Sequence, residues 1–94
     1  MSVDEIIEQV TDICKKNQVE HLSLFGSYAK GKATEKSDID LLISTDISGI
    51  AFYDLVEALR EELKKKVDVL NLEQLDNNND LVKEILRDGI KIYG

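Results

Sequence analysis

The sequence has little that would suit an oxidising compartment or a membrane. Cys14 is its one cysteine, so no disulfide can form within the chain, and a reducing compartment suits the thiol. No stretch approaches the roughly 18 apolar residues of a membrane-spanning helix, and the amino terminus shows no apolar signal segment. We therefore expect a cytoplasmic protein without a membrane partner.

Positive charge is also scarce. Lysine and arginine number 12 against 19 aspartates and glutamates, which gives a net charge of −7. A groove for nucleic acid needs a basic stripe, so we expect no direct nucleic-acid contact. An acidic surface favours a basic partner, although the same surface also serves simply to keep a cytosolic protein soluble.

The chain lacks repeats, linkers and low-complexity tracts, and helical and strand patterns alternate along it. A capping box over residues 2–5 precedes an apolar helical repeat, which predicts a first helix ending at about Lys16 or Asn17. Ser48 is the expected cap of a later helix, whose predicted core face comprises Tyr53, Val56, Leu59 and Leu63. The 94 residues predict one domain, 1–94, with a modest core.

The spacing of the strand patterns predicts how the strands are connected. Between the segment that follows Asp38 and the segment around Asp68 lies a whole helix, which fits a right-handed parallel crossover. The link from Gly26 to Asp38 has room only for a brief helix and a loop, which suits antiparallel neighbours. We expect an α/β (α+β) fold: a small mixed sheet with helices packed mainly on one face and the acids open to solvent on the other.

The most informative pattern is Gly26-Ser27 followed, after ten residues, by Asp38-Ile39-Asp40. The apolar segment at 22–25 predicts a strand that runs straight into Gly26. Glycine tolerates a positive φ and lets a phosphate approach the backbone, while Ser27 adds a hydroxyl and an N–H group. These donors suit the triphosphate of a nucleotide.

Acidic residues interrupt two apolar strand patterns. Asp38 and Asp40 stand two residues apart, which on a strand places both side chains on one face with Cα atoms about 6.6 Å apart. Asp68 lies within an otherwise β-branched segment, and on a neighbouring strand it would complete a three-carboxylate site for two Mg²⁺ ions about 3.5–4 Å apart. The alternative for Asp68 is an edge-strand charge that discourages aggregation.

Other residues near these motifs have two interpretations each. Residues 26–33 nearly spell a P-loop, but Ala33 occupies the position whose hydroxyl should bind magnesium. Tyr28 is able either to stack on a base or to pack in the core. His21 is the only histidine, for which packing or surface hydrogen bonding is favoured over base catalysis. Lys30 and Lys32 suit either a triphosphate or plain solvation.

In Gly26-Ser27, Asp38-Ile39-Asp40 and Val67-Asp68-Val69, the chain resembles the DNA-polymerase-β-like nucleotidyltransferases. Within that superfamily it is similar to the minimal nucleotidyltransferases (MNT) that pair with HEPN toxins. The resemblance implies that Gly26 and Ser27 hold nucleotide phosphates, that Asp38 and Asp40 bind Mg²⁺, and that Asp68 is the third catalytic, metal-binding carboxylate. Lys30 stands where many family members have arginine. Lysine keeps the positive charge but lacks the planar guanidinium that contacts a phosphate through two hydrogen bonds.

The resemblance also implies the reaction. A chain of 94 residues has little surface left to hold an acceptor, which favours a macromolecular acceptor with its own binding surface. In the minimal family AMP passes from ATP to a tyrosine of a HEPN-type ribonuclease toxin. We therefore expect an antitoxin protein adenylyltransferase in a hetero-oligomer with a basic, helical HEPN toxin. Two alternatives stay open: a binding-only antitoxin, and a catalytic subunit that modifies a small molecule or a nucleic-acid end.

Overall fold

A computed structural model of the protein describes residues 1–76 and 78–94. The elements follow one another as α1 (Val3–Lys16), β1 (Val19–Phe25), α2 (Gly26–Ala29), β2 (Ile39–Thr45), α3 (Gly49–Leu63), β3 (Val67–Asn71), the 3₁₀ turn η1 (Leu72–Gln74), α4 (Asp80–Asp88) and β4 (Ile90–Tyr93). No helix among the described residues is both long enough and apolar enough to cross a membrane.

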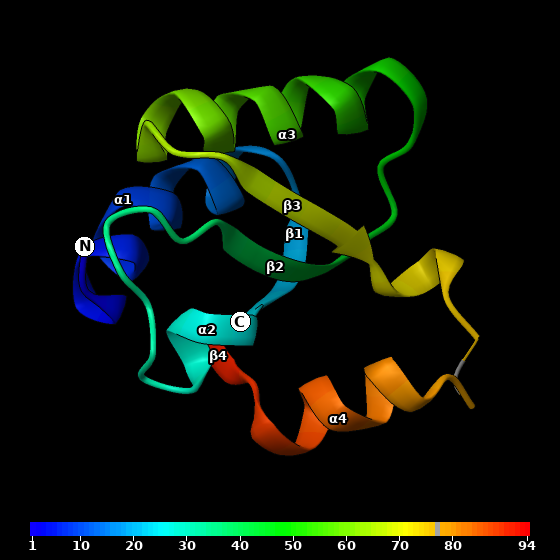
Figure 1. The fold of residues 1–94 in the computed structure, drawn as a ribbon. Coiled ribbons are helices and arrows are strands. Elements are labelled where there is room, and N and C mark those ends of the chain that lie inside the picture. Colours follow the sequence, from blue (N-terminus) through cyan, green and yellow to red (C-terminus); the bar gives the residue numbers. More distant parts are fainter. Residues whose placement is uncertain (77) are drawn as a thin grey trace.

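The strands form one four-stranded mixed sheet in the order β3-β2-β1-β4 (Figure 1). As the connection lengths predict, β1 and β2 are antiparallel, whereas β2 and β3 are parallel and joined through α3. The closing strand β4 pairs antiparallel with β1 and lies at the edge of the sheet. The expected α/β fold with a mixed sheet is confirmed.

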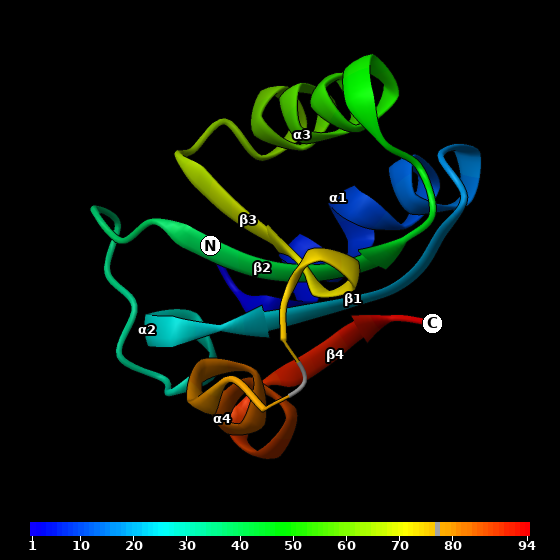
Figure 2. The same ribbon diagram turned by 90° about the vertical axis from the view of Figure 1, so that its right-hand side faces the viewer.

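The helices divide between the two faces of the sheet. Figure 2 shows α1 and α3 together on one side, with the shorter α4 on the opposite side near β1 and β4. The covered face is apolar, because alternate residues of the central strands enter the core with α1 and α3 (Leu22, Leu24, Leu41 and Ile43). We call the other side, which carries α4, the open face.

Local sequence explains where α1 begins and ends. The Ser2 hydroxyl accepts a hydrogen bond from the Glu5 N–H at 3.2 Å, and the Glu5 carboxylate accepts one from the Ser2 N–H at 3.2 Å. This capping box satisfies two amide groups that the first turn cannot pair. The helix ends at Lys16, with Asn17 as its cap, as predicted.

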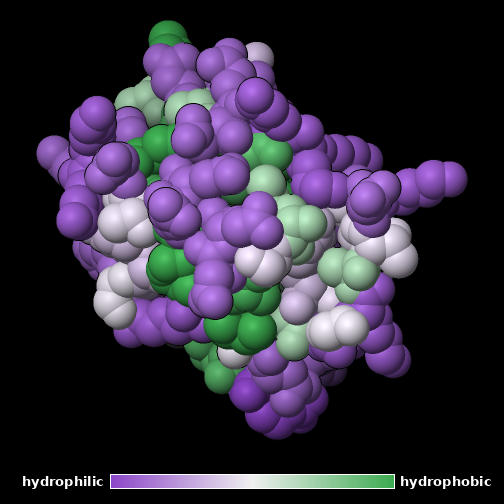
Figure 3. All heavy atoms as spheres, turned by 90° about the vertical axis from the view of Figure 1, so that its left-hand side faces the viewer, coloured by the Kyte–Doolittle hydropathy of each residue, from purple (hydrophilic) through white to green (hydrophobic). Residues whose placement is uncertain are grey.

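The face near the amino terminus is largely hydrophilic, with apolar side chains showing in small patches (Figure 3).

The core face of α3 differs from the prediction. Leu55, Leu59 and Leu63 are buried, whereas Tyr53 is 63% exposed and Val56 is only partly buried. The four-residue spacing of the leucines sets the buried stripe, and Tyr53 falls outside it. Including Tyr53 in the core face was therefore wrong.

The carboxyl end of α3 is tied to the strands that carry the acids. The Arg60 side chain donates a hydrogen bond through Nε to the Val67 carbonyl at 3.1 Å. The Ile39 N–H donates to the Lys66 carbonyl at 3.0 Å, which joins the beginnings of β2 and β3. Lys65 donates through Nζ to the Glu35 carbonyl at 2.6 Å. These bonds hold the amino ends of both strands together.

Candidate functional site

The turn from β1 into α2 leaves room only for glycine. Gly26 adopts a φ of +69°, and a Cβ built on it would collide with the Asp40 carboxylate. The structure therefore places the glycine of the first motif directly against an acid of the second. Ser27 follows at the start of the four-residue α2, where it is partly buried.

The acids Asp40 and Asp68 lie side by side on the open face. They are direct partners in the parallel pairing of β2 and β3, so their side chains point to the same side of the sheet. Partial burial raises the pKa of Asp40, and the charges of Asp68 and Asp38 raise it further. Asp68 does lie on an edge strand, as its alternative interpretation required, but it also faces Asp40.

Asp38 lies just outside the predicted strand, because β2 begins at Ile39. Its carboxylate oxygen Oδ2 is 3.8 Å from Lys66 Nζ. Its charge still contributes to the raised pKa of Asp40. The structure therefore brings Asp40 and Asp68 together directly and holds Asp38 beside them in a pair with lysine.

These oxygen donors are suited to a hard divalent cation. In the two described ranges, 1–76 and 78–94, no three ligating side chains yet surround a common point. Burial raises the pKa of Asp40 most, and the charges of Asp68 and Asp38 add to the rise; a bound cation would offset this repulsion. The carboxylates thus supply the kind of oxygen ligand that Mg²⁺ prefers.

Two other residues that the sequence singled out, Tyr28 and His21, have clear positions. Tyr28 is 5% exposed and belongs to the core, so the base-stacking interpretation is wrong and the packing interpretation is confirmed. His21 is exposed on β1, opposite Ser44. It lies four residues from Phe25, the partner of Asp40, or about 13 Å along the strand. His21 is therefore too far from Asp40 to act as a general base in a reaction at that carboxylate.

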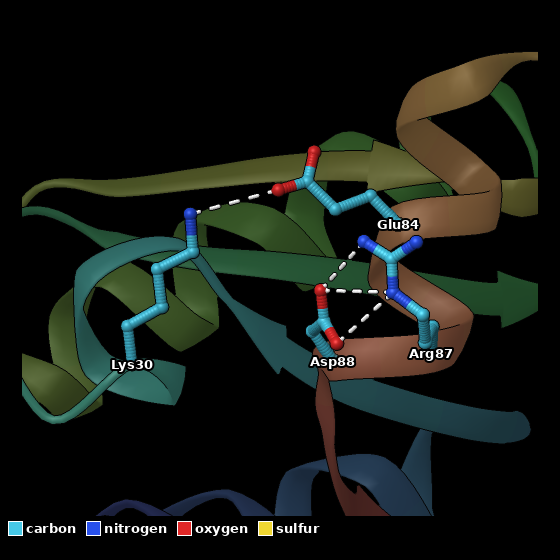
Figure 4. Close-up of polar contacts among 4 residues, drawn as sticks. All are labelled: Lys30, Glu84, Arg87 and Asp88. Carbon is cyan, nitrogen blue, oxygen red and sulfur yellow. Dashed lines mark hydrogen bonds and ion pairs between the residues drawn. The ribbon is translucent and has the colours of Figure 1, made fainter.

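Sequence reasoning missed a cavity beside the phosphate turn. About 240 Å³ in volume, it is lined from one side by Phe25, Gly26 and Ala29 and from the other by residues of α4. Lys30, which sequence left between phosphate contact and solvation, pairs with Glu84 of α4 at 3.5 Å (Figure 4). The helical pattern of α4 predicts a helix but does not predict which strand end it covers, so the sequence held no direct signal for this cavity.

A match to a family model identifies the chain. The model described as "Polymerase beta, Nucleotidyltransferase" matches residues 8–94, which include the phosphate turn and all three acids. The chain belongs to the polymerase β nucleotidyltransferase family. It is thus a nucleotidyltransferase, and the P-loop interpretation of residues 26–33 is wrong.

Curated relatives point to one branch of this family. The chain is 35% identical over 80 residues to MJ1379 of Methanocaldococcus jannaschii, a candidate protein adenylyltransferase, and the match covers 80% of each chain. It is 32% identical over 76 residues to the protein adenylyltransferase MntA of Thermococcus cleftensis, covering 79% of this chain and 75% of MntA. Both relatives are named for AMP transfer to protein.

A solved structure shares the whole fold. A chain from a mutant MntA–HpeT toxin–antitoxin complex superposes with a TM-score of 0.72 at 26% identity. The superposition covers 100% of this chain and 73% of that one. The resemblance to minimal nucleotidyltransferases of toxin–antitoxin pairs is confirmed at the level of family and fold.

Proposed function

We propose that this nucleotidyltransferase is an antitoxin that transfers AMP from ATP to a tyrosine hydroxyl of a HEPN-type ribonuclease toxin and so neutralises it. The observation that carries the proposal is the placement of Asp40 beside Asp68 and against Gly26. Two carboxylates thus lie next to the turn that we assign to phosphate binding, an arrangement that suits transfer at an α-phosphorus. The names of the relatives supply the class of acceptor.

Each residue has a defined part in this mechanism. Gly26 lets the phosphates approach the backbone, and Ser27 donates hydrogen bonds to them. Asp38, Asp40 and Asp68 would hold Mg²⁺, two ions in all, which when bound offset the charge of the phosphates. The acceptor oxygen forms a bond to the α-phosphorus, the bond to the β-phosphate oxygen breaks, and pyrophosphate leaves. The acceptor proton passes to Asp68.

The open face also carries apolar side chains that an acceptor could contact. Leu42 follows Asp40 by two residues on β2. With Leu72 and Leu86 it lines a second cavity of about 210 Å³, whose other walls are polar side chains of β1 and β4 (His21, Ser23 and Lys91). Leu86 is 67% exposed on α4. A protein acceptor with an apolar contact surface fits this arrangement better than a small polar molecule does.

Charge and compartment complete the proposal. The net charge of −7 suits a basic, helical toxin bound in a hetero-oligomer, with no direct contact to nucleic acid. The MntA–HpeT complex shows that a related chain assembles with a toxin. We place the pair in the cytoplasm, where the buried thiol of Cys14 stays reduced.

Label transfer tests the proposal most directly. The protein is mixed with Mg²⁺, extract from its source cells and ATP labelled at the α or, separately, the γ phosphate. We expect α label on one discrete protein, lowered about a hundredfold by Asp40→Asn and unchanged by Asp54→Asn, a control on the exposed side of α3. Transfer of γ label alone would overturn the proposal. Binding of a partner without transfer of either label would establish a masking antitoxin instead.

A further inference from the structure

The cavity of about 240 Å³ beside the phosphate turn has apolar walls from two separate elements. Phe25, Gly26 and Ala29 line it from the turn and α2, and Leu81 and Ile85 line it from α4. Pockets for drug-sized ligands begin at about 300 Å³, so this one suits a smaller planar group. A flat ring system would bury both of its faces between these walls.

Charged side chains also line the cavity. Lys30 Nζ lies 3.5 Å from a carboxylate oxygen of Glu84, with the two side chains 54% and 45% exposed (Figure 4). Asp88 belongs to the same lining and pairs with Arg87 at 2.9 Å. Exposed ion pairs contribute little stability, so Glu84 is able to exchange Lys30 for a ligand at small cost. The lining thus offers two carboxylate acceptors and one cationic donor.

This combination favours an uncharged group over phosphate as the occupant. The carboxylates of Glu84 and Asp88 would repel phosphate oxygens, and the apolar walls offer no hydrogen bonds to them. A nucleobase matches both parts, because its faces are apolar and its edge carries hydrogen-bonding groups. Gly26 belongs to both the cavity wall and the phosphate turn, so a nucleotide held there by its phosphates is within reach of the cavity.

We propose that this cavity receives the base of the nucleoside triphosphate and that Glu84 and Asp88 read its exocyclic amino group. Ionised carboxylates only accept hydrogen bonds. The amino group of adenine donates hydrogen bonds to these carboxylates. Uracil has a carbonyl oxygen at the corresponding edge, and this oxygen is repelled by the carboxylate oxygens because both groups only accept hydrogen bonds. The site therefore selects ATP over UTP. The proposal rests on the proposed function only in placing the phosphates at Gly26-Ser27.

Calorimetric titration of the protein with ATP, UTP and inorganic tripolyphosphate, each with Mg²⁺, tests the site without a partner. Ala29→Leu fills the cavity and is expected to weaken ATP binding about tenfold while leaving tripolyphosphate within about twofold. Glu84→Gln replaces one acceptor with an amide and is expected to lower the preference for ATP over UTP about fivefold. The matched controls are Ala51→Leu and Glu8→Gln, at exposed positions on α3 and α1, which should leave both affinities unchanged.

Four outcomes would overturn the base site. They are equal affinity of the unmodified protein for ATP and UTP, an unchanged preference in Glu84→Gln, unchanged ATP binding in folded Ala29→Leu, or equal weakening of ATP and tripolyphosphate by that variant. If Ala29→Leu does not fold, Leu81→Ala removes part of the opposite wall at a residue 40% exposed and should weaken ATP alone.

The proposed function fails by a different signature. ATP binding that depends on Ala29 and Glu84, without AMP transfer to any partner, would count against the adenylyltransferase and support the base site. Transfer that persists with unchanged ATP affinity in both variants would support the adenylyltransferase and remove the base site. A protein that binds neither ATP nor tripolyphosphate would contradict the phosphate turn, and with it both proposals.

Discussion

The two faces of the sheet are built from the same strands but follow opposite rules. On the covered face, Leu41 of β2 is fully buried with α1 and α3. Its neighbour Asp40 points to the open face, directly opposite Asp68. The covered face lowers the free energy of the folded chain by removing apolar surface from water, whereas the open face holds like charges together at a cost. On β2, the residue that stabilises the fold (Leu41) and the residue assigned to the chemistry (Asp40) are thus direct neighbours in sequence.

Truncation of the covered face should give the largest effect. Leu41→Ala removes a side chain with no exposed area, so we expect a loss of about 2–5 kcal/mol in the free energy of unfolding. Leu86→Ala is the matched control, because this leucine is 67% exposed, and it should change that free energy by about 0.5 kcal/mol at most. Urea denaturation of both variants measures the difference. Equal losses in the free energy of unfolding would show that Leu86 on the open face contributes as much to stability as Leu41 on the covered face.

Replacing the glycine that separates the motifs should give the next largest effect. Gly26→Ala adds a Cβ at a φ of +69° and against the Asp40 carboxylate, so we expect a loss of about 1–3 kcal/mol together with weakened triphosphate binding. Gly31→Ala is the control, because it has a similar φ of +71° with no atom near its added Cβ. Thermal unfolding and calorimetry separate backbone strain, common to both variants, from the collision found only at Gly26.

Removing one charge from the open face should stabilise the protein. Asp40→Asn removes a partly buried charge and ends its repulsion with Asp68, so we expect a gain of about 0.2–1 kcal/mol at pH 7 without metal. Because the pKa of Asp40 is raised in the folded protein, its charge costs stability only above its usual titration range. The gain should therefore shrink as pH falls through that pKa and vanish when the carboxyl is protonated. Melting temperatures from pH 7 down to 3 measure this, and a gain independent of pH would show that the charge of Asp40 carries no cost in the folded protein.

The smallest effect is expected at a buried hydroxyl. The Tyr28 hydroxyl is buried and makes no hydrogen bond to any described residue. Tyr28→Phe removes a polar group that is costly to bury, so we expect a change between about zero and a gain of 1 kcal/mol. Tyr53→Phe, at a residue 63% exposed, serves as the control and should be neutral. Denaturation curves decide this, since a loss above about 1 kcal/mol would reveal a partner for the hydroxyl.

Local pattern and spacing predicted most of the frame. The capping box predicted where α1 begins, and the connection lengths predicted which strands are antiparallel and which are parallel. The facing of Asp68 toward Asp40 followed from strand alternation once the pairing was known. Sequence did not predict the outward position of Tyr53, because the competing leucine stripe is set by packing against the sheet.

The remaining features depend on contacts between segments far apart in sequence. Lys66 pairs with Asp38, and Glu84 pairs with Lys30, across distances that no local pattern reports. The cavity beside Gly26 exists only because α4 returns to the end of β1. Periodicity finds a helix and its apolar stripe, but not the surface on which it comes to rest.

The frame that holds Asp40 next to Asp68 is made of backbone. The parallel ladder of β2 and β3 and the bond from the Ile39 N–H to the Lys66 carbonyl involve no side chain of either acid. Exchange of one aspartate for asparagine therefore removes a carboxylate from the open face without removing a hydrogen bond of this backbone frame. A chain that has lost one of these carboxylates would therefore keep its fold, and with the fold any surface that serves binding alone.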